Sequence, residues 1–592
     1  MTKLDLTIIT LYLLATVGLG IFFSRRGTRS IQEFLVTGRR LPWWLAGMTM
    51  IASAFAIDTP IGITGMVAAH GIPGVWYAWS FVLGGAGMLG AFVFSAMLRR
   101  SEIISPAEIV ALRYDGSAAT ALRAFKAVYF GIIANAVTLG WIIKAVWTIS
   151  GVAVPDVNRD LMLAVILAFT LTYTAASGLW GIAATDFVQF IIGSIGSITL
   201  AWFAWEHIGG IHELVDGLTQ RYGAAETTMR LRFVPGVASP FFVTFLVFLT
   251  LKWWGNPPPA VLQRIIASKN ETHAAKATFF FALVAFGFNY WPMIFVALVS
   301  LVKYPDLVRA EAGYAMLVVD ILPAGVLGMM LASLIAAFMS TVDTHINYGA
   351  SYMVNDLYRR FIVRNASDKH YVRAAQVSTV LMLGIAVLFA YSMDSVSRAW
   401  YFMSMLTAGY GIVMVARWFW WRVNAKAEIT ALAVSGTGST LLSPRFAQWA
   451  GYWEAIGEPG WAARFLVTVG ACTVMWVTVT LLTRPASEKT LERFCRKVKP
   501  FAVGWRPVVR AHPDIEWNRR FGRVCLQWTG GTAALFCFCF GIGHLMFLRF
   551  TIASILLACA IGLIALVFIP YYTRQAGVKT DAAATDVSVD SG

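Results

Sequence analysis

Long apolar stretches alternate with short polar ones along the whole chain. Each apolar stretch has roughly 20 residues, enough for an α-helix to cross a hydrocarbon layer of about 30 Å. Backbone groups in lipid must be hydrogen-bonded within the protein, so continuous runs of this length predict transmembrane helices. We count about 15 of them and expect an all-α integral membrane fold. Their predicted centres are Leu13, Ala54, Gly87, Asn135, Ala168, Ser194, Val247, Phe288, Ala337, Leu383, Leu406, Val434, Met475, Leu535 and Ile561.

Two of the predicted helices carry residues that interrupt a helix near its middle. The second reads Met50-Ile-Ala-Ser-Ala-Phe-Ala-Ile-Asp-Thr-Pro-Ile-Gly62, and the seventh reads Lys252-Trp-Trp-Gly-Asn-Pro-Pro-Pro259. The seventh lies five helices after the second, an odd number, so the two cross the membrane in opposite directions and indicate an inverted repeat. Breaks of this kind free carbonyl oxygens, which are ligands for a hard cation. The alternative is two kinks without function.

Composition and charge agree with a membrane protein. The chain is 58% hydrophobic and only 13% charged, which excludes a soluble fold. The formal net charge is +16, but Lys and Arg gather in the loops on one predicted side, as they do on the cytoplasmic side of membrane proteins. We therefore expect a multi-pass protein of a bacterial-type cytoplasmic (inner) membrane, surrounded by lipid, with the N-terminus outside and the C-terminus cytoplasmic. No nucleic acid is needed to explain the charge.

The ninth predicted helix presents two hydroxyls and a carbonyl on one face. Ala337, Ser340 and Thr341 are spaced i, i+3 and i+4, so they share that face. Sodium takes about five or six oxygen ligands, and neutral ones suffice, as hard cations generally allow. With carbonyls from the break at Ala52 to Phe55, these oxygens predict a sodium site. The alternative is that both hydroxyls bond to carbonyls of their own helix.

Four segments resemble the sodium/solute symporter family, which includes sodium/glucose and sodium/proline cotransporters. The resemblance runs from about Leu41 to Trp421. The segments are Leu41-Pro-Trp-Trp44 to Gly65, Gly178-Leu-Trp-Gly-Ile-Ala-Ala-Thr-Asp186-Phe-Val-Gln189, Gln263-Arg264 with Ala267-Ser-Lys269-Asn270, and Ala336-Ala-Phe-Met-Ser-Thr341 closing in Asn355-Asp-Leu-Tyr358.

The resemblance implies a LeuT-type core, a five-plus-five inverted repeat with extra flanking helices. It implies a sodium site on the carbonyls of Ala52, Phe55 and Ala337 and the hydroxyls of Ser340 and Thr341. It also associates Asp186 with the sodium path on the inner side; the alternative for Asp186 is a cap at a helix start. Asp343 and His345, just beyond the hydroxyl pair, either line the inner exit or form a structural polar cluster.

The pattern divides the chain into six parts. They are a first transmembrane helix with a basic loop (1–40), the transport core (41–425, halves 41–206 and 238–425), additional helices (426–482), a basic cytoplasmic segment (483–527), two last helices (528–573) and a disordered tail (574–592). The basic segment is expected to lie on the anionic inner leaflet.

The solute site departs from the family's known patterns. Sugar-binding members place Gln, Glu and Lys where this chain has Thr59, Ala78 and Ala285, and proline-type members place an Asp where it has Ala54. The remaining candidates near the expected cavity are Asp58, Thr59, Tyr77, Lys252, Trp253, Trp254, Asn256 and Tyr410. Lys252 either meets an anionic solute, pairs with Asp58 or extends to a membrane interface.

We therefore expect a secondary active transporter that moves a small organic solute together with Na⁺ by alternating access. Sodium is the only metal expected, with no organic cofactor. The sequence contains no catalytic cluster, which argues against an enzyme. Two alternatives are a proton-coupled solute transporter and a transporter-like membrane sensor.

Overall fold

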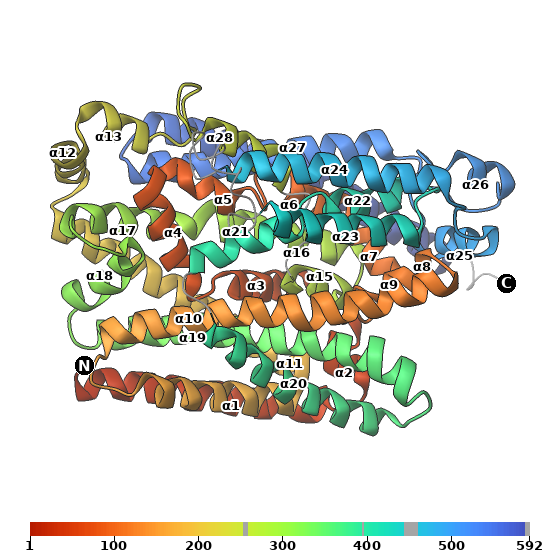
Figure 1. The fold of residues 1–592 in the computed structure, drawn as a ribbon, viewed down its shortest axis with the longest axis horizontal. Coiled ribbons are helices and arrows are strands. Elements are labelled where there is room, and N and C mark those ends of the chain that lie inside the picture. Colours follow the sequence, from red (N-terminus) through yellow and green to blue (C-terminus); the bar gives the residue numbers. More distant parts are fainter. Residues whose placement is uncertain (253–258, 393–395, 443–459, 587–592) are drawn as a thin grey trace.

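A computed structural model describes residues 1–252, 259–392, 396–442 and 460–586, and these residues form helices without any β-strand. The long helices lie side by side along the longest axis of the molecule (Figure 1). Nine of the described helices are long and apolar enough to cross a membrane, and two bent pairs raise this number to as many as eleven. The all-α membrane fold is confirmed. The predicted total of about 15 crossings stays a prediction.

The first part of the chain, up to residue 208, contains helices α1 to α11. Their bounds are α1 Lys3–Gly27, α2 Ile31–Val36, α3 Trp43–Ala54, α4 Asp58–His70, α5 Trp76–Trp79, α6 Ala86–Leu89, α7 Ser95–Ser101, α8 Glu108–Arg113, α9 Gly116–Val128, α10 Asn135–Ala153 and α11 Arg159–Ile208. Short 3₁₀ turns are η1 Thr37–Arg39 and η2 Ile72–Val75, and π-helical turns are η3 Gly90–Phe94 and η4 Tyr129–Ala134.

The middle part contains α12 to α22. Their bounds are α12 Ile211–Tyr222, α13 Ala224–Arg230, α14 Phe242–Thr250, α15 Pro259–Ala267, α16 Glu271–Phe281, α17 Tyr290–Lys303, α18 Gly313–Ile321, α19 Val326–Ser351, α20 Asp368–Tyr391, α21 Val396–Leu406 and α22 Tyr410–Phe419. A 3₁₀ turn, η7 Ala310–Ala312, and two π-helical turns, η6 Ala282–Phe288 and η8 Tyr352–Ile362, join them.

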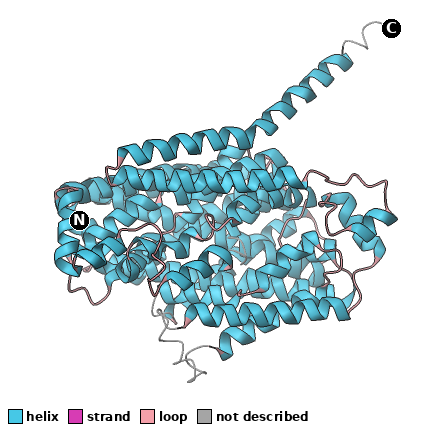
Figure 2. Ribbon diagram, turned by 90° about the horizontal axis from the view of Figure 1, so that it is seen from above, coloured by secondary structure: helices cyan, strands magenta, loops and turns pink. Residues whose placement is uncertain are grey.

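The last part contains α23 Ala425–Leu441, α24 Trp461–Leu482, α25 Glu488–Val498, α26 Arg506–Ala511, α27 Phe521–Met546 and α28 Phe550–Asp586. The end of α28 projects beyond the helix bundle (Figure 2). Where the sequence predicts a disordered tail from residue 574, the structure continues the helix to Asp586.

The first predicted break is confirmed. Helix α3 ends at Ala54, α4 begins at Asp58, and the two are bent by 57°. Pro60 fits in the first turn of α4, where its missing N–H costs nothing, so the break falls just before it. Among the described residues, no backbone N–H donates to the carbonyl of Ala52 or Phe55. These two carbonyls are therefore available as ligands.

The second predicted break lies between α14 and α15. Helix α14 ends at Thr250 and α15 begins at Pro259, and residues 253–258 lie outside the described ranges. Leu41, just before α3, pairs with the end of α15: its N–H donates to Ala267 O at 3.1 Å, and Lys269 N–H donates to Leu41 O at 2.8 Å. Since the start of α3 lies at the end of α15 and the two helices pack together, they run in opposite directions.

Two further interruptions bend helices. Helix segments Trp400–Leu406 and Tyr410–Phe419 are bent by 49° at an unpredicted break, where Gly409 has φ +80°. Helix α11 has 50 residues and contains two of the predicted spans. Its chain turns at Gly178, where φ is +56° and an added Cβ would lie 2.4 Å from the carbonyl oxygen of Phe34. Only glycine fits both requirements at this turn.

The basic segment 483–527 folds against the protein. The apolar face of α25 is buried, and Trp505 has no exposed surface and donates from Nε1 to Trp418 O at 2.9 Å. The guanidinium of Arg113 lies 4.9 Å from the Trp505 ring centre. This apolar face is thus covered by protein, while contact of the segment's basic residues with the inner leaflet stays a prediction.

A buried ionic cluster attaches α23 to the core. Glu428 has no exposed side-chain surface and accepts hydrogen bonds from Lys126 Nζ at 2.5 Å, Arg417 Nη1 at 3.1 Å and Tyr114 Oη at 2.7 Å. These partners lie on or next to α9 and α22. One carboxylate therefore holds three segments that are far apart in the sequence.

Candidate sodium and solute sites

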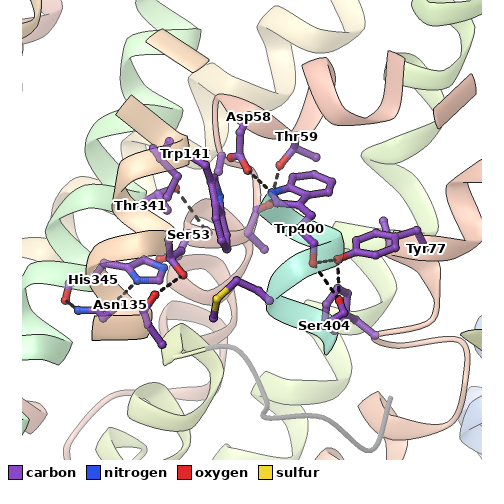
Figure 3. Close-up of a pocket in the computed structure, with 18 of the residues that line it drawn as sticks. Ser53, Asp58, Thr59, Tyr77, Asn135, Trp141, Thr341, His345, Trp400 and Ser404 are labelled. Carbon is purple, nitrogen blue, oxygen red and sulfur yellow. Dashed lines mark hydrogen bonds between the residues drawn. The ribbon is translucent and has the colours of Figure 1, made fainter. Parts of the chain in front are cut away.

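A cavity of about 300 Å³ lies where the α3/α4 break meets α5, α10, α19 and α21 (Figure 3). Its walls are largely aromatic and apolar, with a few polar groups that point inward. The polar side chains that line it are Ser53, Asp58, Thr59, Tyr77, Asn135, Thr138, Lys252, Tyr290, Thr341, His345, Tyr348, Ser404 and Thr407. Cavities of this kind, apolar with a few convergent polar groups, are typical of small-molecule sites.

Asp58 is buried at the first turn of α4, with 3% of its surface exposed. Its Oδ2 accepts a hydrogen bond from Trp400 Nε1 at 3.1 Å. Its Oδ1 has no hydrogen-bond partner of good geometry among the described residues, although the indole of Trp141 lies alongside (Figure 3). Thr59, the next residue, also lines the cavity and donates to Ala54 O at 3.3 Å. The break therefore supplies two of the predicted solute contacts.

Trp400 covers one side of the cavity and was not predicted. Its ring stacks on Tyr77 with centres 5.8 Å apart and 10° between planes. The Tyr77 hydroxyl lies 2.6 Å from Trp400 O and 2.8 Å from Ser404 Oγ. A Cβ added at Gly62 would lie 2.6 Å from Trp400 Cη2, so the indole packs directly on the backbone of α4. With 23 tryptophans in the chain, the sequence offers no signal that selects this one.

Lys252 lies inside the protein and does not extend to a membrane interface, because only 4% of it is exposed. Its Nζ donates to Tyr77 O at 2.5 Å and to Ser80 Oγ at 3.3 Å. The ammonium also lies 3.6 Å from the ring centre of Tyr77 and 3.7 Å from that of Phe81. Lys252 lines the cavity but forms no ion pair with Asp58, so two of its three predicted roles are excluded in this structure.

The other predicted solute contacts have different outcomes. Trp253, Trp254 and Asn256 lie outside the described residues. Tyr410 does not line the cavity: it is fully buried at the start of α22, with its ring 5.6 Å from that of Phe130. Tyr410 begins α22 after a bend of 49° and lies outside the cavity lining.

The predicted sodium ligands on α19 lie against the broken helix. Thr341 Oγ1 is 3.3 Å from Ser53 O and 2.9 Å from Ala337 O, and Ser53 and Thr341 both line the cavity. The shorter distance is a hydrogen bond from Thr341 to a carbonyl of its own helix, as the structural alternative to a sodium site predicts. The longer one places the hydroxyl beside Ser53 O, in the segment that carries the free Ala52 and Phe55 carbonyls. Thr341 thus joins the hydroxyl face of α19 to the broken segment.

Ser340 makes a different contact. Its hydroxyl donates to Asp186 Oδ1 at 2.5 Å, and Asp186 has no exposed surface. The same carboxylate accepts from Thr49 Oγ1 and forms an ion pair with Arg264 Nη2 at 3.3 Å. Asp186 lies well inside α11, beyond the turn at Gly178, so the alternative that it caps a helix start is wrong.

Asp343 and His345 point in different directions from α19. Asp343 Oδ2 accepts from the Tyr173 hydroxyl at 2.5 Å, and Asp343 does not line the cavity. His345 does line it, and its Nδ1 lies 2.5 Å from Asn135 Oδ1, while Asn135 Nδ2 donates to His345 O at 2.8 Å. Residues two apart on a helix face nearly opposite sides, which accounts for this division.

A broken helix with free carbonyls, packed against a hydroxyl-bearing helix beside a cavity, is typical of secondary membrane transporters. Residues 34–435 match the family model described as "Sodium:solute symporter family". The chain belongs to this family. It is a multi-pass membrane protein that carries a solute in symport with sodium, and its relatives are cotransporters, not enzymes.

Individual relatives are similar to this chain over most of their length. The chain is 24% identical over 466 residues to the sodium/glucose cotransporter of Vibrio parahaemolyticus, covering 73% of this chain and 83% of that protein. It is 22% identical over 555 residues to sodium/glucose cotransporter 1 of Oryctolagus cuniculus, covering 83% and 80%. The fold is similar to that of a Na⁺-coupled sialic acid symporter, with a TM-score of 0.64 at 18% identity, covering 82% of this chain and 99% of that chain.

Proposed function

We propose that the coupling sodium ion binds to the carbonyls of Ala52, Phe55 and Ala337 and the hydroxyls of Ser340 and Thr341. One observation carries this assignment: Thr341 Oγ1 lies 3.3 Å from Ser53 O, so the hydroxyl face of α19 meets the α3 break. The two break carbonyls accept no backbone hydrogen bond from the described residues. Five neutral oxygens match the demand of a small hard cation.

The solute occupies the adjacent cavity and contacts Asp58, Thr59, Tyr77 and Lys252. Thr341 belongs to both the ion site and the cavity wall, and Ser53, whose carbonyl lies 3.3 Å from Thr341 Oγ1, also lines the cavity, so bound sodium fixes the shape of the wall that the solute meets. This shared wall provides coupling, since each ligand favours the same arrangement of α3 and α19. Asp186, which holds Ser340, lies on the path by which sodium leaves. Asp343, which is buried on α19, is the second acidic group proposed for that path.

The transport cycle is alternating access by a five-plus-five inverted repeat, with halves 41–206 and 238–425 and about 15 membrane crossings. The antiparallel packing of α3 and α15 supports this arrangement, because each belongs to one of the two broken helices. We place the protein in a bacterial inner membrane with the N-terminus outside and the C-terminus cytoplasmic, following the distribution of Lys and Arg. Each sodium charge that enters contributes about 2.3 kcal/mol per 100 mV.

Sodium-dependent stabilisation of the purified protein tests the ion site. A ligand that binds the folded state raises the unfolding midpoint by mass action. We expect NaCl to raise the midpoint at constant ionic strength and pH, with choline chloride as the replacement salt. The double variant Ser340→Ala, Thr341→Ala should lose this rise and remain folded.

Ser333→Ala is the matched control, since Ser333 is a buried serine on α19 whose hydroxyl has no hydrogen-bond partner among the described residues. It should keep the full sodium effect. An unchanged sodium effect in the double variant would refute the assignment. Equal stabilisation by choline, together with a response to pH alone, would favour proton coupling instead.

A further inference from the structure

Two buried groups of opposite charge line the solute cavity, and neither has an ion-pair partner among the described residues. They are Asp58 and Lys252, which are 3% and 4% exposed. The buried ion pairs of the described chain join other groups, namely Arg123 with Asp356, Lys126 and Arg417 with Glu428, and Arg264 with Asp186. Charged groups inside a membrane protein are costly and mark functional sites. These two need an explanation that the fold alone does not supply.

Each of the two groups has unused hydrogen-bonding capacity. The Lys252 ammonium has three protons and meets two neutral oxygens, Tyr77 O and Ser80 Oγ. The rings of Tyr77 and Phe81 flank it. On Asp58, Oδ2 is used by Trp400, while Oδ1 has no partner of good geometry among the described residues. One donor and one acceptor are thus left for a molecule in the cavity.

The charge balance of the loaded site favours an anion. The proposed sodium ligands are all neutral oxygens, so bound sodium adds one positive charge. Asp58 and Lys252 cancel each other, and His345 is counted as neutral. Counted over the groups that line it, the cavity therefore carries one net positive charge when sodium is bound, between aromatic walls that screen it poorly; Asp343 does not line the cavity and is not part of this sum. A solute with one carboxylate brings this charge to zero.

A second cavity continues beyond Lys252. It has a volume of about 140 Å³ and shares Phe81, Lys252, Phe281 and Phe286 with the first, so these side chains form the common wall. Arg417 lines the second cavity. Because Arg417 is paired with Glu428, Lys252 is the cation without an ion-pair partner among the described residues that line the two cavities.

We infer that the solute is a small organic acid that also carries a hydroxyl or ammonium donor. Its carboxylate meets Lys252 Nζ, and its donor meets Asp58 Oδ1. The inference rests on the proposed function, which places sodium and solute side by side, and it names the chemical class of that solute. The lining offers no comparable reason to select an uncharged polyol, because such a solute would leave both charges unanswered.

Matched pairs of compounds test the inference. The thermal unfolding midpoint of the full-length protein is measured in NaCl and in choline chloride. Each acid is compared with a counterpart that lacks the carboxylate: glycerate with glycerol, glucuronate with glucose, and serine with serinol. The comparison is then extended to a library of such pairs. We expect at least one acid to raise the unfolding midpoint in sodium while its counterpart does not. Lys252→Met should weaken half-saturation by that acid about tenfold or more, as expected for loss of a hydrogen bond to a charged group.

Further variants keep the test decisive. Lys252→Arg should retain part of the effect, and Lys252→Gln serves if the Met variant does not fold. Lys144→Met is the control, because Lys144 is a lysine of α10 that does not line the cavity. The inference is overturned if no acid stabilises, if the counterparts stabilise equally, or if the Lys252 variants keep full affinity for the acid. If only an uncharged compound stabilises the protein in a sodium-dependent way, the organic-acid inference fails but the proposed sodium-coupled function stands. If an acid stabilises the protein equally in sodium and in choline, the coupling to sodium is contradicted.

Discussion

The hydroxyl of Ser340 donates to Asp186 Oδ1 at 2.5 Å, and neither side chain has exposed surface. Asp186 also accepts from Thr49 and pairs with Arg264. These partners stand on α3, α15 and α19, while Asp186 itself stands on α11. One carboxylate therefore connects both broken helices with the helix that carries the sodium hydroxyls, and it sets the orientation of Ser340.

Removal of Asp186 should destabilise the protein strongly. Asp186→Ala leaves the guanidinium of Arg264 buried without a counter-charge, and losing one partner of a buried pair costs about 3–5 kcal/mol. The double variant Asp186→Leu, Arg264→Met should be more stable than Asp186→Ala, because no isolated charge remains. Thermal unfolding midpoints of the purified variants measure both effects. If the double variant loses as much stability as the two single variants together, Asp186 and Arg264 do not interact directly.

The contact between Gly62 and Trp400 gives a second prediction. A Cβ at position 62 would lie 2.6 Å from Trp400 Cη2, so Gly62→Ala should force the indole off Asp58 and cost about 1–3 kcal/mol by overpacking. The smaller ring of Trp400→Phe should recover part of this loss in the double variant. Unfolding midpoints of the four proteins of this cycle provide the measurement.

Gly384→Ala is the control for this cycle, because nothing lies within 4 Å of a Cβ added there. In a helix interior, alanine should be neutral or slightly stabilising. If the two alanine variants behave alike, Trp400 does not pack on α4 as the structure indicates.

The sequence predicts those features that depend on local chemistry. Pro60 and Gly62 mark the first break, and the spacing of Ser340 and Thr341 marks the hydroxyl face, because helix geometry alone decides both. Asp58 and Thr59 line the cavity because they stand at the break.

Features made by distant parts of the chain escape such reasoning. Trp400 lies 342 residues from Asp58, and no local pattern connects them. The break before Tyr410 falls at Gly409 in an apolar stretch. The chain contains 50 glycines, so a glycine alone does not predict a break. The role of Asp186 depends on three partners from three other helices. The apolar face of α25 is hidden by protein contacts that charge composition does not reveal.

Glu428 should be essential for attaching α23. Its carboxylate lies within ion-pair distance of Lys126 and Arg417, all three buried. Glu428→Ala should cost about 3–5 kcal/mol because two buried cations lose their counter-charge. The exposed pair of Arg496 and Asp514 offers the comparison, and Asp514→Ala should leave the unfolding midpoint unchanged. Equal effects of the two substitutions would contradict the burial of the cluster.

Docking of segment 483–527 should weaken in acid. Partial burial raises the pKa of Asp115, but hydrogen bonds from Ser487 and Thr490 outweigh this and hold that pKa below its usual value. Because the pKa of Asp115 is lowered in the docked state, its ionised carboxylate stabilises docking fully above about pH 4, the ordinary pKa of Asp. This stabilisation disappears as the pH falls through the lowered pKa. Hydrogen exchange at the Ser487 amide, which donates to Asp115 Oδ2 at 2.8 Å, should therefore accelerate in that range beyond its intrinsic pH dependence. Asp115→Ala should show the fast exchange already at neutral pH, whereas Asp514→Ala, in the same segment, should not. Exchange at Ser487 that follows the intrinsic rate at every pH would show that this carboxylate does not hold the segment.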